Sequence, residues 1–166
     1  IGNTNNGYVK AIFDTLGLDA VTVSPYLGKE SLQPFLERAD KGIIVLVKTS
    51  NPGAGEFHDL NVDGKPLYQI VAEHVKECNT NGNLGVVVGA TYPEELKKVR
   101  EIVGDMPILV PGAGVQRGDL ETIKQGLDSK GQGLIVNSSR GIIFADDPAK
   151  AAEDLHNQIQ EAIKNG

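Results

Sequence analysis

The chain has 166 residues, of which 40% are hydrophobic and 23% charged, and its 16 Lys and Arg against 22 Asp and Glu give a net charge of −6. This is the composition of a globular domain, and its acidic balance argues against nucleic-acid or anionic-membrane partners, which require positive charge. No apolar run approaches the roughly 18–20 residues of a membrane-spanning helix. The single cysteine, Cys78, rules out an internal disulfide and a thiolate zinc site. We expect a cytoplasmic protein, although a disulfide-free secreted protein would have the same composition.

Short apolar strands alternate with amphipathic helices along the whole chain. The strands are rich in Val and Ile and nearly continuous in hydrophobicity, as strands of a parallel sheet are when both faces are buried. They are expected at residues 20–23, 43–47, 85–88, 108–110 and 134–136.

Apolar residues with helical spacing predict six helices, one before the first strand and the others after the strands. The helices are expected within residues 8–16, 32–36, 66–78, 91–103, 120–127 and 147–163. Residues 2–7 are expected to form a loop before the first helix, which should end at Gly17. We expect Pro34 in the first turn of the second helix, and a capping box of Thr91 and Glu94 at the fourth.

The histidines and the cysteine give weak signals. His74 and Cys78 are expected to pack inward from the third helix, whereas His58 and His156 are expected to be solvated. No cluster of His, Asp and Glu has the spacing of metal ligands, so we expect no metal site.

The order of strands and helices predicts an α/β fold with a parallel sheet and right-handed crossovers. No linker or low-complexity segment interrupts residues 1–166, so we expect no internal domain boundary. An open doubly wound sheet and part of an eightfold barrel both fit this pattern. In both architectures ligands bind at the carboxyl ends of the strands, which is where the unusual loops of this chain lie.

The loop after the second strand reads Lys48-Thr49-Ser50-Asn51-Pro52-Gly53. Its hydroxyls, carboxamide and glycine could read a polar heterocycle, although a simple chain-reversing turn explains the same residues. The loop after the fourth strand, residues 111–119, is neither a GxGxxG fingerprint nor a Walker A loop. Within it, Gln116 offers donors and an acceptor that could bridge two parts of a ligand, but a mobile glycine-rich loop is an equal alternative.

The loop after the fifth strand reads Asn137-Ser138-Ser139-Arg140-Gly141. Arg140 carries a permanent positive charge in a planar fork that suits a phosphate, and the serines can add donors. Barrels that bind phosphate do so in the loops after their last two strands. If the fourth and fifth predicted strands are the last two of a barrel, Gln116 and Arg140 would converge on one phosphate. A solvated surface arginine is the alternative.

Five segments in order resemble one known family. They are Ile1-Gly2-Asn3-Thr4, Thr22-Val23-Ser24-Pro25-Tyr26-Leu27-Gly28, Val47-Lys48-Thr49-Ser50-Asn51-Pro52-Gly53, Val110-Pro111-Gly112-Ala113-Gly114-Val115-Gln116 running on to Gly118-Asp119, and Ser138-Ser139-Arg140-Gly141. The ordered set is similar to orotidine 5′-monophosphate decarboxylase, most closely to the bacterial branch whose fifth-strand loop reads Thr-Ser-Asn-Pro-Gly. The resemblance spans essentially the whole chain.

The resemblance implies a (β/α)8 TIM barrel that works as a homodimer, of which this chain holds strands four to eight and their helices. Residues 1–166 would then be the C-terminal five-eighths of a single barrel domain. It also implies decarboxylation of orotidine 5′-monophosphate to uridine 5′-monophosphate, the last step of de novo pyrimidine biosynthesis, with no cofactor and no metal.

The family hallmark Asp-x-Lys-x-x-Asp-Ile-x-x-Thr is only partly present. Ile1 and Thr4 match its end, so the catalytic lysine and both aspartates would precede Ile1. The resemblance therefore implies that the chain as printed holds no catalytic residue of its own. Because the family's Asp-Ile-x-x-Thr end reaches the neighbouring subunit, Ile1 and Thr4 are expected to act across the dimer interface.

The matched motifs imply roles in binding the nucleotide. Ser50 would bind the pyrimidine edge, with Pro111 and Ala113 lining the base pocket. Gln116 would contact both base and phosphate, and Arg140 with the Ser139 backbone N–H would hold the phosphate. The sequence departs from the family at Arg117, where many relatives carry glycine.

Two other interpretations remain open at this point. The chain could be a catalytically incomplete fragment that binds a phosphorylated ligand, or it could belong to a related metal-dependent keto-sugar-phosphate decarboxylase. The second would need a divalent metal, so activity that survives a chelator would exclude it.

Overall fold

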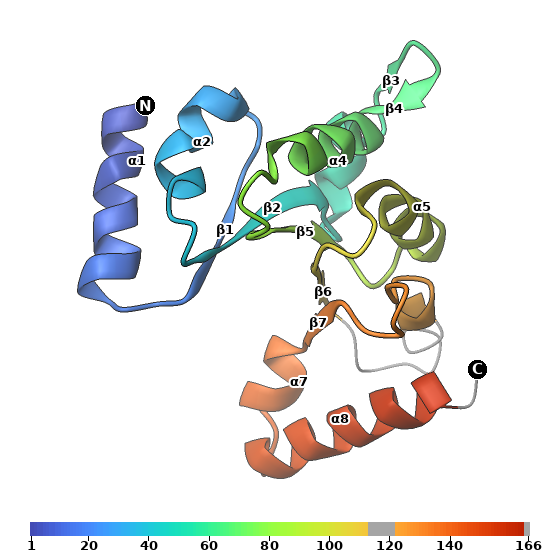
Figure 1. Ribbon diagram of the computed structural model, residues 1–166. Coiled ribbons are helices and arrows are strands. Elements are labelled where there is room, and N and C mark those ends of the chain that lie inside the picture. Colours follow the sequence, from blue (N-terminus) through green and yellow to red (C-terminus); the bar gives the residue numbers. More distant parts are fainter. Residues whose placement is uncertain (113–121, 165–166) are drawn as a thin grey trace.

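A parallel sheet of five strands forms the centre of the computed structural model, which describes residues 1–112 and 122–164 (Figure 1). In spatial order the strands are β1 (Ala20–Val23), β2 (Gly42–Lys48), β5 (Leu84–Val88), β6 (Ile108–Pro111) and β7 (Leu134–Asn137). All five predicted strands are confirmed, and no end is displaced by more than one residue. Spatial order follows chain order, so every crossover joins neighbouring strands.

Helices precede β1, connect the strands of the sheet and follow β7. They are α1 (Gly2–Val9) continued by the π-helical segment η1 (Lys10–Thr15), α2 (Gly28–Leu36), the 3₁₀ turn η2 (Pro52–Ala54) with α3 (Gly55–His58), α4 (Leu67–Cys78), α5 (Pro93–Val103), α7 (Ser139–Ile143) and α8 (Pro148–Lys164). Residues 122–124 are also helical and belong to the helix expected over 120–127, whose beginning lies outside the described residues.

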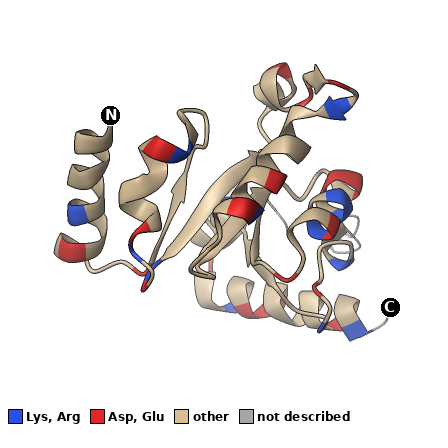
Figure 2. Ribbon diagram, turned by 45° about the horizontal axis from the view of Figure 1, so that its top comes forward, with Lys and Arg blue, Asp and Glu red and all other residues tan. Residues whose placement is uncertain are grey.

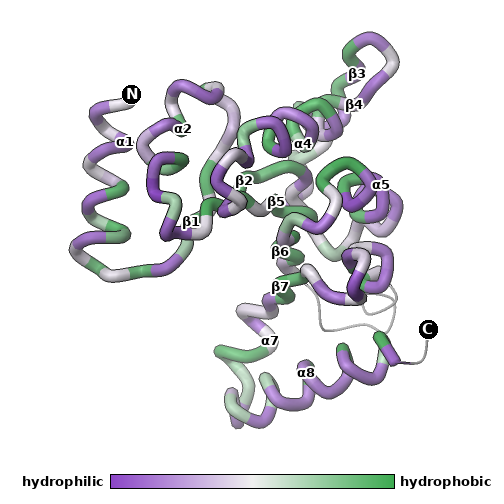
Figure 3. The backbone as a smooth tube through the Cα atoms, viewed as in Figure 1, coloured by the Kyte–Doolittle hydropathy of each residue, from purple (hydrophilic) through white to green (hydrophobic). Residues whose placement is uncertain are grey.

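The core lies where the strands meet the helices. Every residue of β5 is buried, as a strand covered on both faces requires, and Figure 3 shows the central strands as the most hydrophobic part of the trace. Leu96 and Val99 of α5 and Ala72 and Val75 of α4 are buried against this sheet. The hydrophobic pattern of the sequence identified the core side of α5, whereas in α4 it found Val75 but not the buried Ala72.

The N-terminal segment differs from the prediction. Residues 2–7, expected as a loop, form the first part of α1, which lies beside α2 in Figure 1. Glycine and asparagine are poor helix formers, so the helix depends on packing, with Val9 and Phe13 buried in the core. Gly17 follows η1 with a positive φ of 66°, as its predicted role at the helix end requires.

Two predicted helix starts are wrong. Pro34 lies inside α2, near its end and not in its first turn, so the helix tolerates the loss of one backbone donor. α5 begins at Pro93 with Tyr92 at the N-cap and no side-chain cap, so Thr91 and Glu94 form no capping box. Proline at the first helical position supplies the start signal instead, because its fixed φ already suits a helix.

A short antiparallel hairpin, β3 (Asn61–Val62) and β4 (Lys65–Pro66), precedes α4 and was not predicted. Its turn is made by Asp63 and Gly64, which have φ values of 52° and 85°. Asp-Gly is a preferred pair for such a turn because both positions require a positive φ, so the signal was present in the sequence.

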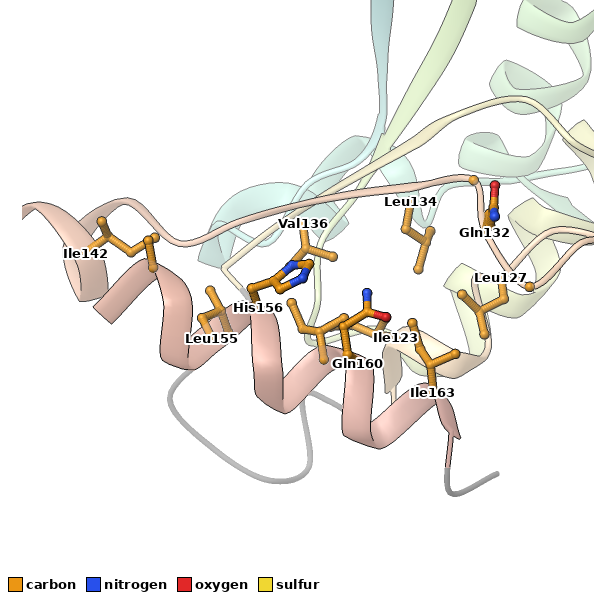
Figure 4. Close-up of a pocket in the computed structure, with 14 residues that line it drawn as sticks. Ile123, Leu127, Gln132, Leu134, Val136, Ile142, Leu155, His156, Gln160 and Ile163 are labelled. Carbon is orange, nitrogen blue, oxygen red and sulfur yellow. The ribbon is translucent and has the colours of Figure 1, made fainter. Parts of the chain in front are cut away.

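The last helix leaves an apolar groove against the sheet. α8 begins where predicted, with the Lys150 N–H donating to the Asp147 carboxylate at 3.0 Å. Between α8 and β7 lies a hollow of about 500 Å³ whose lining includes Val136, Leu155 and Ile159 (Figure 4). Leu134 and Val136 of β7 line this hollow and are only half-buried, so this apolar face is only partly covered.

Charged residues are spread over the surface. Figure 2 shows Lys and Arg interspersed with Asp and Glu on several elements of the described chain, and no helix is wholly basic. Among the described residues, no helix has both the length and the apolar character needed to cross a bilayer.

Candidate active site

The carboxyl ends of the strands form one continuous edge. Backbone hydrogen bonds continue past the strands: Gly89 N–H donates to Lys48 O at 2.8 Å, and Ala90 N–H to Pro111 O at 3.1 Å. Gly112 N–H donates in the same way to Asn137 O, also at 3.1 Å. The segments that follow β2, β5, β6 and β7 are therefore held side by side. Ligand sites of parallel α/β proteins form at such an edge.

Ser50 follows β2 at this edge and is exposed. It lies directly against the backbone of Gly89, so closely that Gly89 has no room for a side chain. Beside it, the Thr49 hydroxyl lies 2.6 Å from the Asn51 carboxamide oxygen, to which it donates. The hydroxyl of Ser50 is thus available to a ligand at a position held by the neighbouring strand.

Pro111 and Arg140 lie at the other end of the same edge. Pro111 is paired with Asn137 in the register of β6 and β7, and Arg140 follows Asn137 after one turn of chain. Ser139 and Arg140, expected in a loop, form the first turn of the short helix α7. Both side chains are exposed, and no hydrogen bond or ion pair engages the Arg140 guanidinium within the described residues. A permanent cation with free donors at this edge can bind a phosphate.

Of the four other predicted site residues, two lie outside the described residues and two lie on α1, away from this edge. Ala113 and Gln116 lie outside the described residues, so their expected contacts with base and phosphate stay predictions. Ile1 and Thr4 are exposed at the start of α1, far along the sheet from α7 in Figure 1. Their expected role across the dimer interface stays a prediction.

Lys48, the last residue of β2, was not predicted to have a role at this edge. Its side chain is 1% exposed and forms an ion pair with Asp59, which follows α3. The ammonium also lies 4.6 Å from the ring centroid of Tyr92 and 5.8 Å from that of Tyr68. The available signal was a lysine that directly continues the apolar run of a buried strand, where a charge needs a partner.

The histidine predictions are also corrected. His58, expected to be solvated, is half-buried, and its Nδ1 accepts the Thr49 N–H at 3.4 Å. Burial lowers the pKa of His58, and the nearby Lys48 charge lowers it further, while Asp59 opposes the shift. His74, expected to face inward, is exposed and lies 3.7 Å from the half-buried Cys78 sulfur, and His156 is exposed as predicted.

A hollow of about 730 Å³ lies beside the β2 segment, on the side of α4. Its described lining is mostly apolar and includes Tyr26 and Phe57, whose ring centroids are 6.1 Å apart in an edge-to-face contact. No lysine or arginine of the described chain lines this hollow, so its described lining does not suit a phosphate. Among the described residues, no group of three or more His, Cys, Asp or Glu could hold a metal ion.

Comparison with known proteins decides the family. Residues 1–155 match the model of the orotidine 5′-phosphate decarboxylase / HUMPS family. The chain belongs to this family. An orotidine 5′-phosphate decarboxylase from Ralstonia pickettii is 54% identical over 147 residues, which cover 87% of this chain and 54% of the relative. One from Cupriavidus necator is 51% identical over 168 residues, covering 98% of this chain and 62% of the relative.

Solved structures of the orotidine 5′-phosphate decarboxylase family share the fold. The Leishmania donovani OMP decarboxylase superposes with a TM-score of 0.90 at 40% identity, covering 96% of this chain and 63% of that one. The Leishmania donovani UMP synthase gives a TM-score of 0.92 at 42% identity, covering 98% of this chain and 37% of that one. The five-stranded parallel sheet is therefore a half-barrel of this family, and the chain spans between 54% and 62% of these two curated relatives.

Proposed function

We propose that a full-length chain carrying this sequence decarboxylates orotidine 5′-monophosphate to uridine 5′-monophosphate. The observation that carries this proposal is 51% identity over 98% of the chain to a relative named for that activity. The exposed Ser50 and Arg140 at one sheet edge support it. β1, β2, β5, β6 and β7 would be strands four to eight of a (β/α)8 barrel.

The activity has two parts, binding of the nucleotide and breakage of its carbon–carboxylate bond. The bond between C6 of the pyrimidine and its carboxylate breaks, carbon dioxide leaves, and the electron pair on C6 accepts a proton. No electron sink is required if a cation lies beside C6 and water is kept out. In the family this cation is the lysine of the hallmark Asp-x-Lys-x-x-Asp-Ile-x-x-Thr. Only the end of that hallmark, Ile1 and Thr4, is matched here.

The residues of this chain would bind the nucleotide. Ser50 would bind the pyrimidine edge, Pro111 would line the base pocket, and Arg140 with the Ser139 N–H would hold the phosphate. Gln116 would join base and phosphate. Binding energy from the remote phosphate accelerates the reaction only to the extent that the contacts strengthen towards the transition state.

We also propose that the protein is a homodimer in which α1 contacts the partner subunit's site. Ile1 and Thr4 are exposed on α1, as a contact across subunits needs. A cytoplasmic location stays a prediction from composition.

The decisive experiment measures carbon dioxide release from orotidine 5′-monophosphate by a full-length chain, with and without a chelator. Activity that survives the chelator supports the proposal. Activity lost with the chelator, or found only with a keto-sugar phosphate, would favour the metal-dependent alternative. Phosphate-ligand binding without any decarboxylation would favour an incomplete binding protein.

A further inference from the structure

The segment that carries Ser50 is closed at its base by a buried charge. Lys48 ends β2, the chain runs through η2 and α3, and it returns at Asp59 to form an ion pair with the Lys48 ammonium. One residue further in, the Thr49 N–H donates to His58. The two ends of residues 49–58 are therefore held together by the Lys48–Asp59 ion pair and by the hydrogen bond from the Thr49 backbone to the His58 side chain.

The Lys48 ammonium is held from the helix side of the sheet. Tyr68 lies in the first turn of α4, and Tyr92 immediately precedes α5, so the two rings approach Lys48 from neighbouring crossovers. Lys48 is 1% exposed, whereas the Asp59 side chain is 53% exposed. The pair thus has a dry end in the core and a wet end at the surface.

Burying a lysine at the end of β2 is less favourable for stability than burying an apolar side chain there. Taking an ammonium out of water costs several kcal/mol, and an apolar side chain of similar size usually gives equal or greater stability. Such a group needs another explanation than packing. The Lys48 carbonyl accepts the Gly89 N–H at 2.8 Å, and Gly89 in turn lies against Ser50. The ion pair and the strand contact therefore act on the same short stretch of backbone.

We propose that Lys48 is a positioning residue: through its ion pair with Asp59 it closes residues 49–58 and so holds Ser50 where the base of the nucleotide binds. Lys48 touches no substrate in this role. The proposal rests on the proposed function, because Ser50 is assigned to the pyrimidine there.

The role predicts a loss that depends on the ligand. Uridine 5′-monophosphate carries a base and a phosphate, whereas ribose 5-phosphate carries only the sugar and the phosphate. In a full-length chain, Lys48→Met should weaken binding of the nucleotide about 10-fold, the equivalent of one lost hydrogen bond. It should change ribose 5-phosphate binding by less than about 2-fold, because Arg140 lies at the other end of the sheet edge.

The matched control is Lys65→Met. Lys65 forms an ion pair with Glu73 at 2.7 Å, but both side chains are 43% exposed and lie outside the Ser50 segment. This variant loses the same charge and should bind both ligands as the parent does. Asp59→Asn tests the same link from its solvated end if Lys48→Met fails to fold, and Asp59→Glu should restore binding.

Calorimetric titration with both ligands, together with hydrogen exchange of residues 49–58, decides the matter. Selective loss of nucleotide binding with faster exchange supports the proposal. Equal loss of both ligands, or no loss of either, overturns it. A parent chain that binds neither ligand refutes the proposed function and the role of Ser50 with it, while the exchange rates still show whether Lys48 closes the segment.

Discussion

Gly89 and Ser50 lie so close together that a Cβ added to Gly89 would stand 2.7 Å from the Cβ of Ser50. The same added atom would lie 3.1 Å from the Ser50 backbone nitrogen, so rotating a side chain cannot relieve the clash. One of the two strand ends would have to move. The position of Ser50 is therefore set by a glycine on the neighbouring strand.

Gly89→Ala should displace Ser50 and weaken binding of uridine 5′-monophosphate by about 10- to 100-fold, since misplacement of about 1 Å can cost 100-fold in a site. Titration of a full-length chain measures this. Gly42→Ala is the control: an added Cβ would stand 3.1 Å from the Ala20 Cβ, but at the start of β2, at the opposite end of the sheet from Ser50, so it should leave binding unchanged. An alanine at position 89 that leaves binding unchanged would show that Ser50 does not contact the nucleotide.

Arg140→Ala should lower kcat/KM for orotidine 5′-monophosphate by about 10²–10⁴, if a charge-assisted phosphate contact is worth roughly 3–5 kcal/mol in a closed site. Steady-state kinetics of a full-length chain tests this. Lys150→Ala removes an equal charge from the exposed side of α8 and should have little effect. Comparable losses in the two variants would point to a general effect of charge and contradict a phosphate contact.

Arg100 should be the largest single polar contribution to stability among the described residues. Its guanidinium is buried and donates to four backbone carbonyls, those of Gly104, Gly126, Met106 and Gly133. These carbonyls lie at the opposite end of the sheet from the proposed site, near the starts of β6 and β7.

Arg100→Met should lower the free energy of unfolding by about 2–4 kcal/mol, because several buried carbonyls lose their donor. Urea denaturation measures the change. Lys98→Met breaks an exposed ion pair with Glu101 on the same helix and should cost less than about 1 kcal/mol. Similar urea midpoints for the two variants would rule out the role given to Arg100.

Acid should loosen the Ser50 segment through His58. The folded state lowers the pKa of His58, chiefly by burial, so the unfolded chain binds a proton at higher pH than the folded one. Stability from this group is present above the unfolded pKa of about 6.5 and is lost as pH falls through the lowered folded value. Protonation also removes the acceptor for the Thr49 N–H.

His58→Asn keeps an acceptor near the same place but does not titrate. The difference in urea midpoint between pH 7.5 and pH 5 should therefore be smaller in this variant than in the parent. His156→Asn, at an exposed position, is the matched control for the substitution. An unaltered pH dependence in the His58 variant would show that this histidine titrates alike in both states.

The fold was predictable where hydrophobicity alone decides it. β5 and its neighbours are short apolar runs rich in Val and Ile, a pattern typical of strands buried on both faces, and the sequence placed them correctly. Residues 2–7 and Pro34 were misjudged because local propensity argues against a helix there, and contacts between distant residues override it.

The site was predictable to the extent that topology determines it. Ser50, Pro111 and Arg140 lie at or just after the carboxyl ends of parallel strands, so they had to reach one edge once the strand order was known. The burial of Lys48 could not be read from spacing, since it depends on Tyr92 and Asp59 arriving from other segments.

The open half-barrel has a consequence for handling the protein. β1 and β7 end the described sheet, and each presents one side of its backbone without a neighbouring strand. Ile135 of β7 is 47% exposed, so this edge strand offers an exposed hydrophobic side chain as well as free backbone hydrogen-bonding groups. Exposed edge strands of this kind pair with strands of other chains, which leads to aggregation. Expressed by itself, this 166-residue stretch should oligomerise or precipitate with rising concentration.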